Sequence, residues 1–188
     1  MDPDLDLLKS GDASLSLGND GVSGGRLRTA RRDDAPLLSA WREANKHWFL
    51  SSFPPDIEAT ARWIASYVAD PTRILLVVEV GDVAVGQLGF REISVKDRSA
   101  EIDNVLRGSP TPDHPGTMGR AMEAAIRWAR STLAIETFLL VVFEDNPARR
   151  FYERHGFSAW GTSRLLGFEG ASPERGAWVP SEEGSRYL

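Results

Sequence analysis

Cysteine and long apolar runs are missing from this sequence. Without a cysteine thiol, disulfide bonds and thiolate metal sites are excluded. The apolar runs, such as residues 74–78, are far too short to span a bilayer. The first residues include Asp2, Asp4 and Asp6, whereas a signal peptide carries Lys or Arg there. We therefore expect a soluble, cytoplasmic protein without a membrane partner.

Basic residues are outnumbered, since the formal net charge is −5. Attraction of the whole surface to nucleic acid needs a dominant basic face, so no nucleic-acid partner is expected. The 188 residues, 41% of them hydrophobic and 26% charged, predict one domain of ordinary size. We assign it to residues 26–180, between a flexible N-terminal tail (residues 1–25), rich in Gly, Ser and Asp, and a C-terminal tail (residues 181–188).

Apolar periodicity and chain breakers predict alternating strands and helices. Gly81 and Asp82 form a two-residue turn between two of the strands. The predicted strands cover residues 27–30, 74–80, 83–90, 100–107 and 138–143. The predicted helices follow Asp33 or Asp34, Asp56, Gly116 and Asn146. This order gives an α/β fold whose mixed sheet is antiparallel at its start and parallel across the helix that begins near Gly116.

For three of these segments the sequence also predicts which side chains share a face or are buried. The helix over residues 56–69 has one apolar stripe, formed by Ile57, Ala61, Ile64 and Val68. Alternation along the strand over residues 100–107 places four side chains on one face, namely Glu101, Asp103, Val105 and Arg107. Residues 138–143 are all apolar, which is typical of a strand covered on both faces.

The segment from Asn146 to Phe157 is a short helix with strong end signals. Asn146 predicts an N-cap, and Pro147 suits the first helical position, where its missing N–H costs nothing. Gly156 stands where a left-handed C-cap is needed. The helix is therefore sharply bounded at both ends.

This segment resembles the signature of the GNAT superfamily of N-acetyltransferases. The matching positions are Asn146, Ala148, Phe151, Tyr152, Gly156 and Phe157. The family's glycine-containing loop is matched less closely, because Gly116 can serve as its first glycine while Asp113 and Met118 depart from the pattern. The resemblance implies a mixed sheet of six to seven strands flanked by about four helices. It also implies that the strands over residues 100–107 and 138–143 diverge to admit the pantetheine arm of acetyl-CoA.

The resemblance further assigns residues to the co-substrate and to the chemistry. Residues expected to bind acetyl-CoA are Val105, Leu106, Arg107, Gly116, Thr117, Met118, Gly119, Arg120, Asn146, Arg149 and Tyr152. Tyr152 is expected to protonate the leaving thiolate, although it could instead pack in the core. Glu101 and Asp103 are candidates for the base, with Glu101 the first choice, although either could be an exposed or ion-paired strand residue. Because cysteine is absent, direct attack in a ternary complex is favoured.

The acceptor is expected to contact the segment from Trp41 to Phe53. The residues expected there are Trp41, Arg42, Asn45, His47 and Trp48, which look similar to those of amino-sugar acetyltransferases. The leading acceptor is thus a small-molecule primary amine, such as a nucleotide-linked amino sugar. The alternatives are a protein N-terminus or lysine, and a non-catalytic acyl-CoA-binding module. No metal site is expected, since His114 and His155 lack ligand spacing, and a homodimer is compatible with the sequence.

Overall fold

The computed structural model describes residues 3–18, 25–49, 56–108, 115–143 and 145–159, and beyond them four short strands. The chain divides into two compact units. The sheet unit contains residues 1–41 and 56–139, and the second unit contains residues 42–55 and 140–188. Within the described residues, no helix combines the length and the apolar character needed to cross a membrane.

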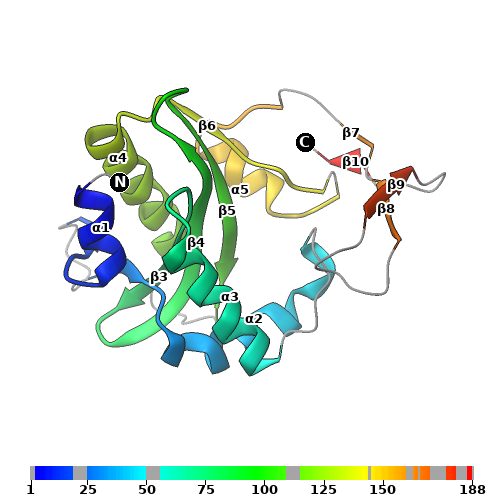
Figure 1. The fold of residues 1–188 in the computed structure, drawn as a ribbon. Helices are drawn as coiled ribbons and strands as arrows, with labels where there is room; N and C mark the ends of the chain where they lie inside the picture. The colour runs from blue at the N-terminus through cyan, green and yellow to red at the C-terminus, as the bar shows by residue number, and fades with distance from the viewer. Residues whose placement is uncertain are drawn as a thin grey trace. The chain divides into compact units, whose positions relative to one another are not determined.

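A six-stranded sheet forms the centre of the sheet unit (Figure 1). Its strands, in spatial order, are β1 (Leu15–Ser16), β2 (Gly25–Thr29), β3 (Ile74–Val80), β4 (Val83–Ser94), β5 (Ser99–Arg107) and β6 (Thr137–Leu139). Neighbouring strands are antiparallel except β5 and β6, which are parallel across a helix. Gly81, at φ +60°, lies in the predicted turn between β3 and β4. The mixed sheet predicted from the sequence is confirmed.

The helices of the sheet unit cover both faces of the sheet. They are α1 (Pro3–Ser10), the 3-10 turn η1 (Arg32–Asp34), α2 (Ala35–Ala44, which continues into the second unit), α3 (Ile57–Ala69) and α4 (Thr117–Leu133). α4 packs on one face of the sheet, where its Met118 lies against Gly86 of β4. A Cβ added to Gly86 would be 2.4 Å from the Met118 Sδ. α3 packs on the opposite face, where Tyr67 contacts Asp103. We call these the α4 face and the α3 face.

Helix α3 begins at the predicted cap. The Asp56 carboxylate accepts a 2.7 Å hydrogen bond from the Ala59 N–H, which satisfies a donor that the helix leaves open. The buried side chains of α3 are Thr60, Ala61, Ile64 and Tyr67. Ile57 and Val68, predicted on the buried stripe, are 52% and 46% exposed. They stand near the two ends of the helix, so periodicity alone placed them wrongly.

The N-terminal segment is part of the folded sheet unit. Residues 1–25 were expected to be a flexible tail, and for residues 3–18 this is wrong, because α1 and β1 form there. Leu5, Leu8 and Leu17 are 3%, 1% and 5% exposed. The Thr29 hydroxyl on β2 donates to the carbonyl of Leu8. Leucines three positions apart on one turn of a helix bury together, which a composition rich in Gly, Ser and Asp concealed.

Strand β6 is shorter than predicted. The expected strand over residues 138–143 pairs only at Thr137–Leu139, and Leu139 is 41% exposed at the sheet edge. The remaining apolar residues of that run belong to the second unit, where Val142 is buried. Val142 is the one buried residue of the run, so the prediction of a strand covered on both faces is wrong, because β6 lies at the edge of the sheet.

The second unit contains short elements. They are η2 (Lys46–Trp48), α5 (Arg149–Arg154), β7 (Ser163–Arg164), β8 (Leu166–Glu169), β9 (Ala177–Pro180) and β10 (Arg186–Tyr187). β8 pairs with β9 and β10 pairs with β7, in both cases antiparallel. The expected C-terminal tail over residues 181–188 thus contains a paired strand. The domain boundaries at residues 26 and 180 stay a prediction.

Replacing Leu8 with alanine should test whether α1 is part of the cooperative fold. Leu8 is 1% exposed, and a large-to-small change in a core costs about 2–5 kcal/mol of unfolding free energy. Leu7→Ala is the matched control, because Leu7 is 51% exposed on the same helix and should change stability by less than about 0.5 kcal/mol. Urea unfolding followed by circular dichroism measures both. Equal stability of the two variants would show that α1 does not contribute.

Candidate active site

An extra residue in β5 shapes the candidate site. Gly89 of β4 faces Asp103, but two residues earlier Gln87 faces Leu106, so β5 holds one more residue than its partner over this interval. Asn104, inside the interval, has φ +54°. Asparagine is among the residues that tolerate this left-handed conformation. The result is a β-bulge, a feature that is common beside active sites because it re-aims side chains.

The bulge corrects the predicted alternation along β5. Glu101 and Asp103 share the α3 face, as predicted. After the bulge the alternation changes phase, so Leu106 joins the α3 face and Arg107, opposite Gly86, lies on the α4 face. The prediction that Arg107 shares a face with the two carboxylates is therefore wrong, since one inserted residue reverses the direction of every later side chain.

The Asp103 carboxylate is held by hydrogen bonds from neutral groups. Its Oδ2 accepts from the Tyr67 hydroxyl and from the Asn104 Nδ2, both at 2.7 Å. Its Oδ1 accepts from the backbone N–H of Asn104 at 2.7 Å. The Asn104 Nδ2 also lies 2.9 Å from the Tyr67 hydroxyl. We call Tyr67, Asp103 and Asn104 the Asp103 cluster.

Tyr67 stays a neutral donor in the Asp103 cluster. Burial, together with the adjacent Asp103 charge, raises the pKa of the Tyr67 phenol far above its ordinary value. Sequence reasoning missed both Tyr67 and Asn104. The available signal was Tyr67 at three positions after Ile64, because a tyrosine on the buried side of a helix needs a polar partner for its hydroxyl. Nothing in the sequence around Asn104 indicated its role, because the pairing register of two strands cannot be read from one of them.

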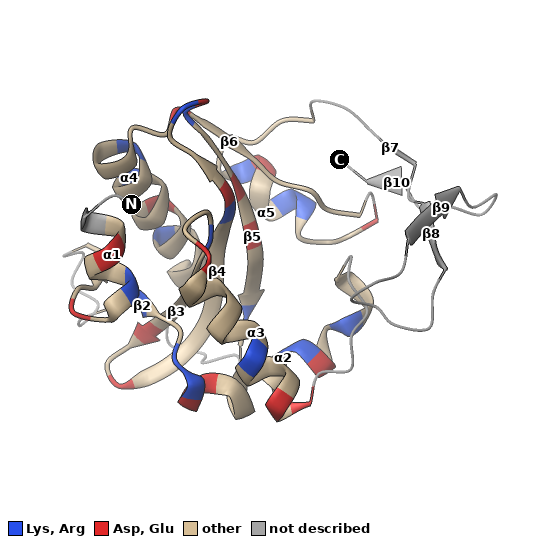
Figure 2. Ribbon diagram, in the orientation of Figure 1, with Lys and Arg blue, Asp and Glu red and all other residues tan. Residues whose placement is uncertain are grey.

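Glu101 lies in a different environment from Asp103. Arg91, opposite it on β4, donates to Glu101 at 2.5 Å. The Glu101 side chain is only 13% exposed. Burial raises the pKa of the Glu101 carboxyl, and the hydrogen bond and charge of Arg91 oppose this rise. Figure 2 marks the acidic positions of β5 in red.

Gln87 supports the bulge from β4. Its side chain is 2% exposed, and its Nε2 donates to the Asn104 carbonyl at 3.4 Å. Its Oε1 is buried and has no hydrogen-bond partner among the residues that the structure describes. A buried acceptor without a partner is costly. Gln87 therefore offers a hydrogen-bond acceptor beside the bulge.

Strand β5 extends beyond the end of its parallel partner, β6. The ladder between β5 and β6 ends where Glu101 faces Leu139, whereas β5 continues to Arg107. The predicted backbone contacts for a pantetheine arm, Val105 to Arg107, all lie beyond this end point. The start of α4 lies nearby, since a Cβ on Gly86 would meet Met118 at 2.4 Å and the Leu106 carbonyl at 2.8 Å.

The first turn of α4 has features that suit phosphate. Gly116 precedes it at φ +78°, in the left-handed region. Arg120 folds back over the turn, because its guanidinium donates to the Pro115 carbonyl at 3.3 Å and to the Thr117 hydroxyl at 3.2 Å. Open N–H groups, the helix dipole and a guanidinium all favour an anion here. The predicted residues 116–120 thus form one local group, while Asp113 lies outside the described residues.

Trp41 reaches the end of β5 from α2. The indole lies against Gly108, because a Cβ on Gly108 would be 2.3 Å from the Trp41 Cζ2. Trp41 is 6% exposed. This predicted acceptor residue is therefore packed against the backbone that follows β5, which limits the ring area it can offer to a ligand.

The other predicted acceptor residues belong to the second unit. Arg42 is 5% exposed, and its guanidinium lies 4.2 Å from the centre of the Phe49 ring. The rings of His47 and Trp48, in η2 after Asn45, are in contact with 4.8 Å between their centres and a 55° angle between their planes. Residues 50–55, which include Phe53, lie outside the described part of the chain.

The signature segment of the second unit has its predicted C-terminal end, but the predicted N-terminal end is wrong, because the N-cap of α5 is Ala148 and not Asn146. The Asn146 side chain accepts a 2.8 Å bond from the Ala148 N–H, although α5 starts at Arg149 rather than at Pro147. Gly156 has φ +88°. Its N–H donates to the Glu153 carbonyl and the Phe157 N–H to the Tyr152 carbonyl, which is a Schellman motif. The intervening turn over Pro147 and Ala148 accounts for the later start.

Tyr152 and Arg149 lie on α5. The Tyr152 ring contacts Phe151 and Phe157, with ring centres 5.4 Å and 6.2 Å away. Arg149 forms an ion pair with Glu153 at 3.7 Å. Within the described residues there is no group of three or more His, Asp or Glu side chains that could hold a metal ion.

Solved structures that resemble this chain are acetyltransferases. One, from Salmonella typhimurium, modifies the N-terminal serine of a 50S ribosomal subunit protein; it is 17% identical, with a TM-score of 0.71 over 93% of this chain and 96% of that chain. A spermidine N-acetyltransferase from Vibrio cholerae, of dodecameric structure, is 20% identical, with a TM-score of 0.60 over 87% and 92%. The ribosomal acetyltransferase RimL, in complex with coenzyme A, is 18% identical, with a TM-score of 0.67 over 93% and 96%.

At these identities the structural likeness establishes the fold. Comparison with curated protein sequences found no match. Residues 26–158 match the family described as the acetyltransferase (GNAT) domain. This range includes all of β2 except Gly25, the strands β3 to β6 with the bulge, and α5. The chain therefore belongs to the GNAT acetyltransferase family and is an acyltransferase.

Proposed function

We propose that this protein transfers an acetyl group from acetyl-CoA to a primary amine by direct attack in a ternary complex. One observation carries the proposal: Glu101 and Asp103 share the α3 face beside a bulge, but in different environments. One carboxylate is buried and ion-paired, and the other is held by neutral donors. Such a pair can divide proton transfer and amine binding between its members.

Glu101 is the proton acceptor in this proposal. An ammonium must lose its proton before it attacks, and an ordinary carboxyl is a weak base for this step. Burial raises the pKa of the Glu101 carboxyl, which makes its carboxylate a stronger base. The Glu101 Oε1 accepts a hydrogen bond from Arg91. The proton of the ammonium therefore passes to the Glu101 Oε2, directly or through a water molecule.

Asp103 binds the amine as a cation and orients it. Its hydrogen-bond partners, Tyr67 and Asn104, are neutral, so they fix the carboxylate in place without cancelling its charge. A fixed anion beside the bulge attracts an ammonium group toward Glu101, two residues away on the same face of β5. Sequence reasoning had offered both acids for the same role.

Acetyl-CoA supplies the activated acetyl thioester, and two groups of residues in the sheet unit fit it. Arg120 and the N–H groups from Thr117 to Gly119 suit the phosphates. The backbone of Val105 to Arg107, beyond the end of the β5–β6 ladder, suits the amide groups of the pantetheine arm. From the second unit, Asn146 and Arg149 are proposed to contribute further contacts.

Tyr152 is proposed as the acid that protonates the departing thiolate. Support comes from its place in the signature segment, since α5 closes with the expected Schellman motif and holds the ring between Phe151 and Phe157. A phenol hydroxyl can give its proton to a coenzyme A thiolate as charge develops on the sulfur. Aromatic packing and catalysis are compatible at this position.

We propose a small-molecule primary amine as the acceptor. An acceptor that arrives as an ammonium matches the anionic Asp103. The adjacent rings of His47 and Trp48 offer the aromatic surface expected for a sugar, whereas Trp41 and Arg42 are largely buried. The Salmonella enzyme with a TM-score of 0.71 favours a second candidate, the α-amino group of a protein.

A panel of amines tests the proposed function. Purified protein, incubated with acetyl-CoA and either glucosamine, spermidine or a peptide with an N-terminal serine, should release free thiol, which a chromogenic reagent detects. We expect turnover with a small amine to exceed turnover with the peptide. The reverse order would move the acceptor to protein N-termini. Tight binding of acetyl-CoA without turnover on any amine would indicate a non-catalytic module.

Arg91 should set the acidic limb of the pH profile. Activity needs ionised Glu101, so kcat/KM falls as the pH falls through its raised pKa, above the ordinary 4.5. Arg91 holds that pKa down, so Arg91→Gln should move the limb to higher pH. Glu101→Gln should lower kcat about a hundredfold or more. Arg98→Gln is the control, because its guanidinium contacts Glu136 and the Ala134 carbonyl at the surface and does not contact Glu101. An unmoved limb in Arg91→Gln would exclude Glu101 as the base.

Replacing Tyr152 with phenylalanine should lower kcat by about tenfold to a hundredfold and leave the affinity for acetyl-CoA nearly unchanged. The hydroxyl acts on charge that appears only in the transition state, so the ground-state complex loses little. Steady-state kinetics and calorimetric titration with acetyl-CoA measure the two effects. An unchanged kcat would remove Tyr152 from the mechanism.

A further inference from the structure

Lys9 joins the N-terminal helix α1 to the end of α3. Its Nζ donates to the backbone carbonyls of Tyr67 at 3.1 Å and Val68 at 3.4 Å, and also to that of Asp70. Lys9 is only 8% exposed. The last carbonyls of a helix have no partner within the helix, and a cation is favoured at this end. Lys9 therefore satisfies groups of α3 that the helix itself leaves open.

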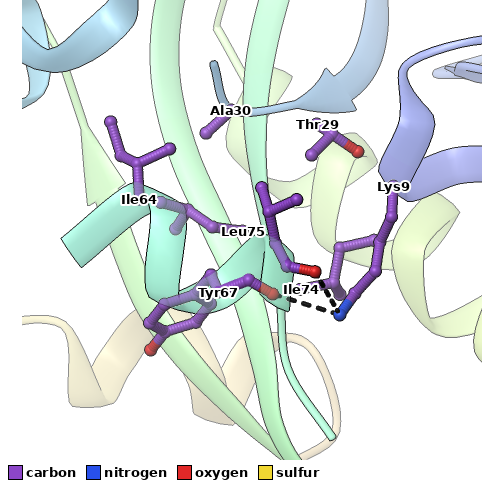
Figure 3. Close-up of a pocket in the computed structure, with 8 residues that line it drawn as sticks. Lys9, Thr29, Ala30, Ile64, Tyr67, Ile74 and Leu75 are labelled. Carbon is purple, nitrogen blue, oxygen red and sulfur yellow. Dashed lines mark hydrogen bonds between the residues drawn. The ribbon is translucent and has the colours of Figure 1, made fainter. Parts of the chain in front are cut away.

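The surroundings of Lys9 make these bonds hard to replace. Figure 3 shows the side chain at a narrow pocket lined by Ile64, Ile74 and Leu75. The pocket has essentially no volume for a water molecule. A side chain without a donor at this position would leave the α3 carbonyls unsatisfied among apolar groups, which is costly. The position of this end of α3 thus depends on Lys9.

Tyr67 connects Lys9 to the candidate site. Its backbone carbonyl accepts from Lys9, while its ring points away from the lysine (Figure 3) and its hydroxyl donates to Asp103 at 2.7 Å. One residue thus contacts α1 through its backbone and β5 through its side chain. A shift of the end of α3 would move the hydroxyl that holds the Asp103 carboxylate.

We propose that Lys9 is a positioning residue for the amine-binding carboxylate, acting through Tyr67 on Asp103. Helix α1 is then part of the acceptor side of the active site, although it supplies no group that touches the substrate. The role of Asp103 rests on the proposed function, whereas the mechanical link from Lys9 to the bulge does not. The two can therefore be tested separately.

The link is tested by hydrogen exchange of the full-length protein. Lys9→Met removes the ammonium and keeps most of the apolar stem. We expect the amides of Asn104 to Leu106 to exchange roughly threefold to tenfold faster, the range typical of coupled contacts. Lys96→Met, in the exposed turn between β4 and β5, is the control and should leave these amides unchanged.

A double variant shows whether the effect passes through the Tyr67 hydroxyl. Tyr67→Phe alone should also speed exchange at the bulge, because Asp103 loses a donor. Adding Lys9→Met to it should then produce no further change at the bulge, while exchange in α1 still rises. Purely additive effects would mean that Lys9 stabilises the whole fold without positioning Asp103, and would overturn the proposal.

Kinetics separate the proposal from the function on which it rests. With glucosamine or spermidine as the acceptor, Lys9→Met should raise the KM of the amine about threefold to tenfold and leave the KM of acetyl-CoA within about twofold. Faster exchange confined to α1 and the end of α3, with an unchanged KM for the amine, would refute the link. If the unaltered protein acetylates no amine, the proposed function fails, while the exchange experiment still decides the link.

If Lys9→Met does not fold, Lys9→Gln provides the same test. The amide keeps an N–H group for the α3 carbonyls, so we expect a smaller rise in exchange at Asn104 to Leu106. A folded Lys9→Gln protein with unaltered exchange at the bulge and an unaltered KM for the amine would again refute the link.

Discussion

The single extra residue in β5 determines which chemistry each face of the sheet presents. Side chains alternate along a strand, so an inserted residue turns everything after it to the other side. Asp103 precedes the insertion and stays on the α3 face, whereas Arg107 follows it and lies on the α4 face. The carboxylates are thereby directed to one side of the sheet, and the arginine to the side from which α4 presents Arg120 and its first turn.

Around this bulge, neutral side chains make most of the hydrogen bonds that hold the groups in place. Gln87, Tyr67 and Asn104 contact the bulge or the adjacent carboxylate without adding charge. Hydrogen bonds from neutral donors fix an anion at modest cost and leave it able to attract a cation. By contrast, the negative charge of Glu101 is paired with the positive charge of Arg91. Two carboxylates separated by one residue thus have different hydrogen-bond partners, an arginine for Glu101 and neutral donors for Asp103.

The sequence predicts the features that depend on neighbouring residues. The turn at Gly81, the cap at Asp56, the amphipathic α4 and the closing Gly156 all follow local rules, and each is present. The signature segment also led to the family, which the match over residues 26–158 establishes. Local rules fail where another strand or helix decides the outcome. The bulge at Asn104, the ion pair of Arg91 and the burial of α1 depend on partners far away in the chain.

Gly86 is a point of close packing between β4, β5 and the first turn of α4, since an added Cβ would lie 2.4 Å from the Met118 Sδ and 2.8 Å from the Leu106 carbonyl oxygen. The Met118 thioether can turn aside, whereas the backbone carbonyl of Leu106 cannot, so a side chain at residue 86 would strain the pairing of β4 with β5. A methyl group there would displace the part of β5 whose backbone is proposed to bind the pantetheine arm. A natural variant at this position would then bind acetyl-CoA more weakly, as if a direct contact had been lost, although the cause would be steric.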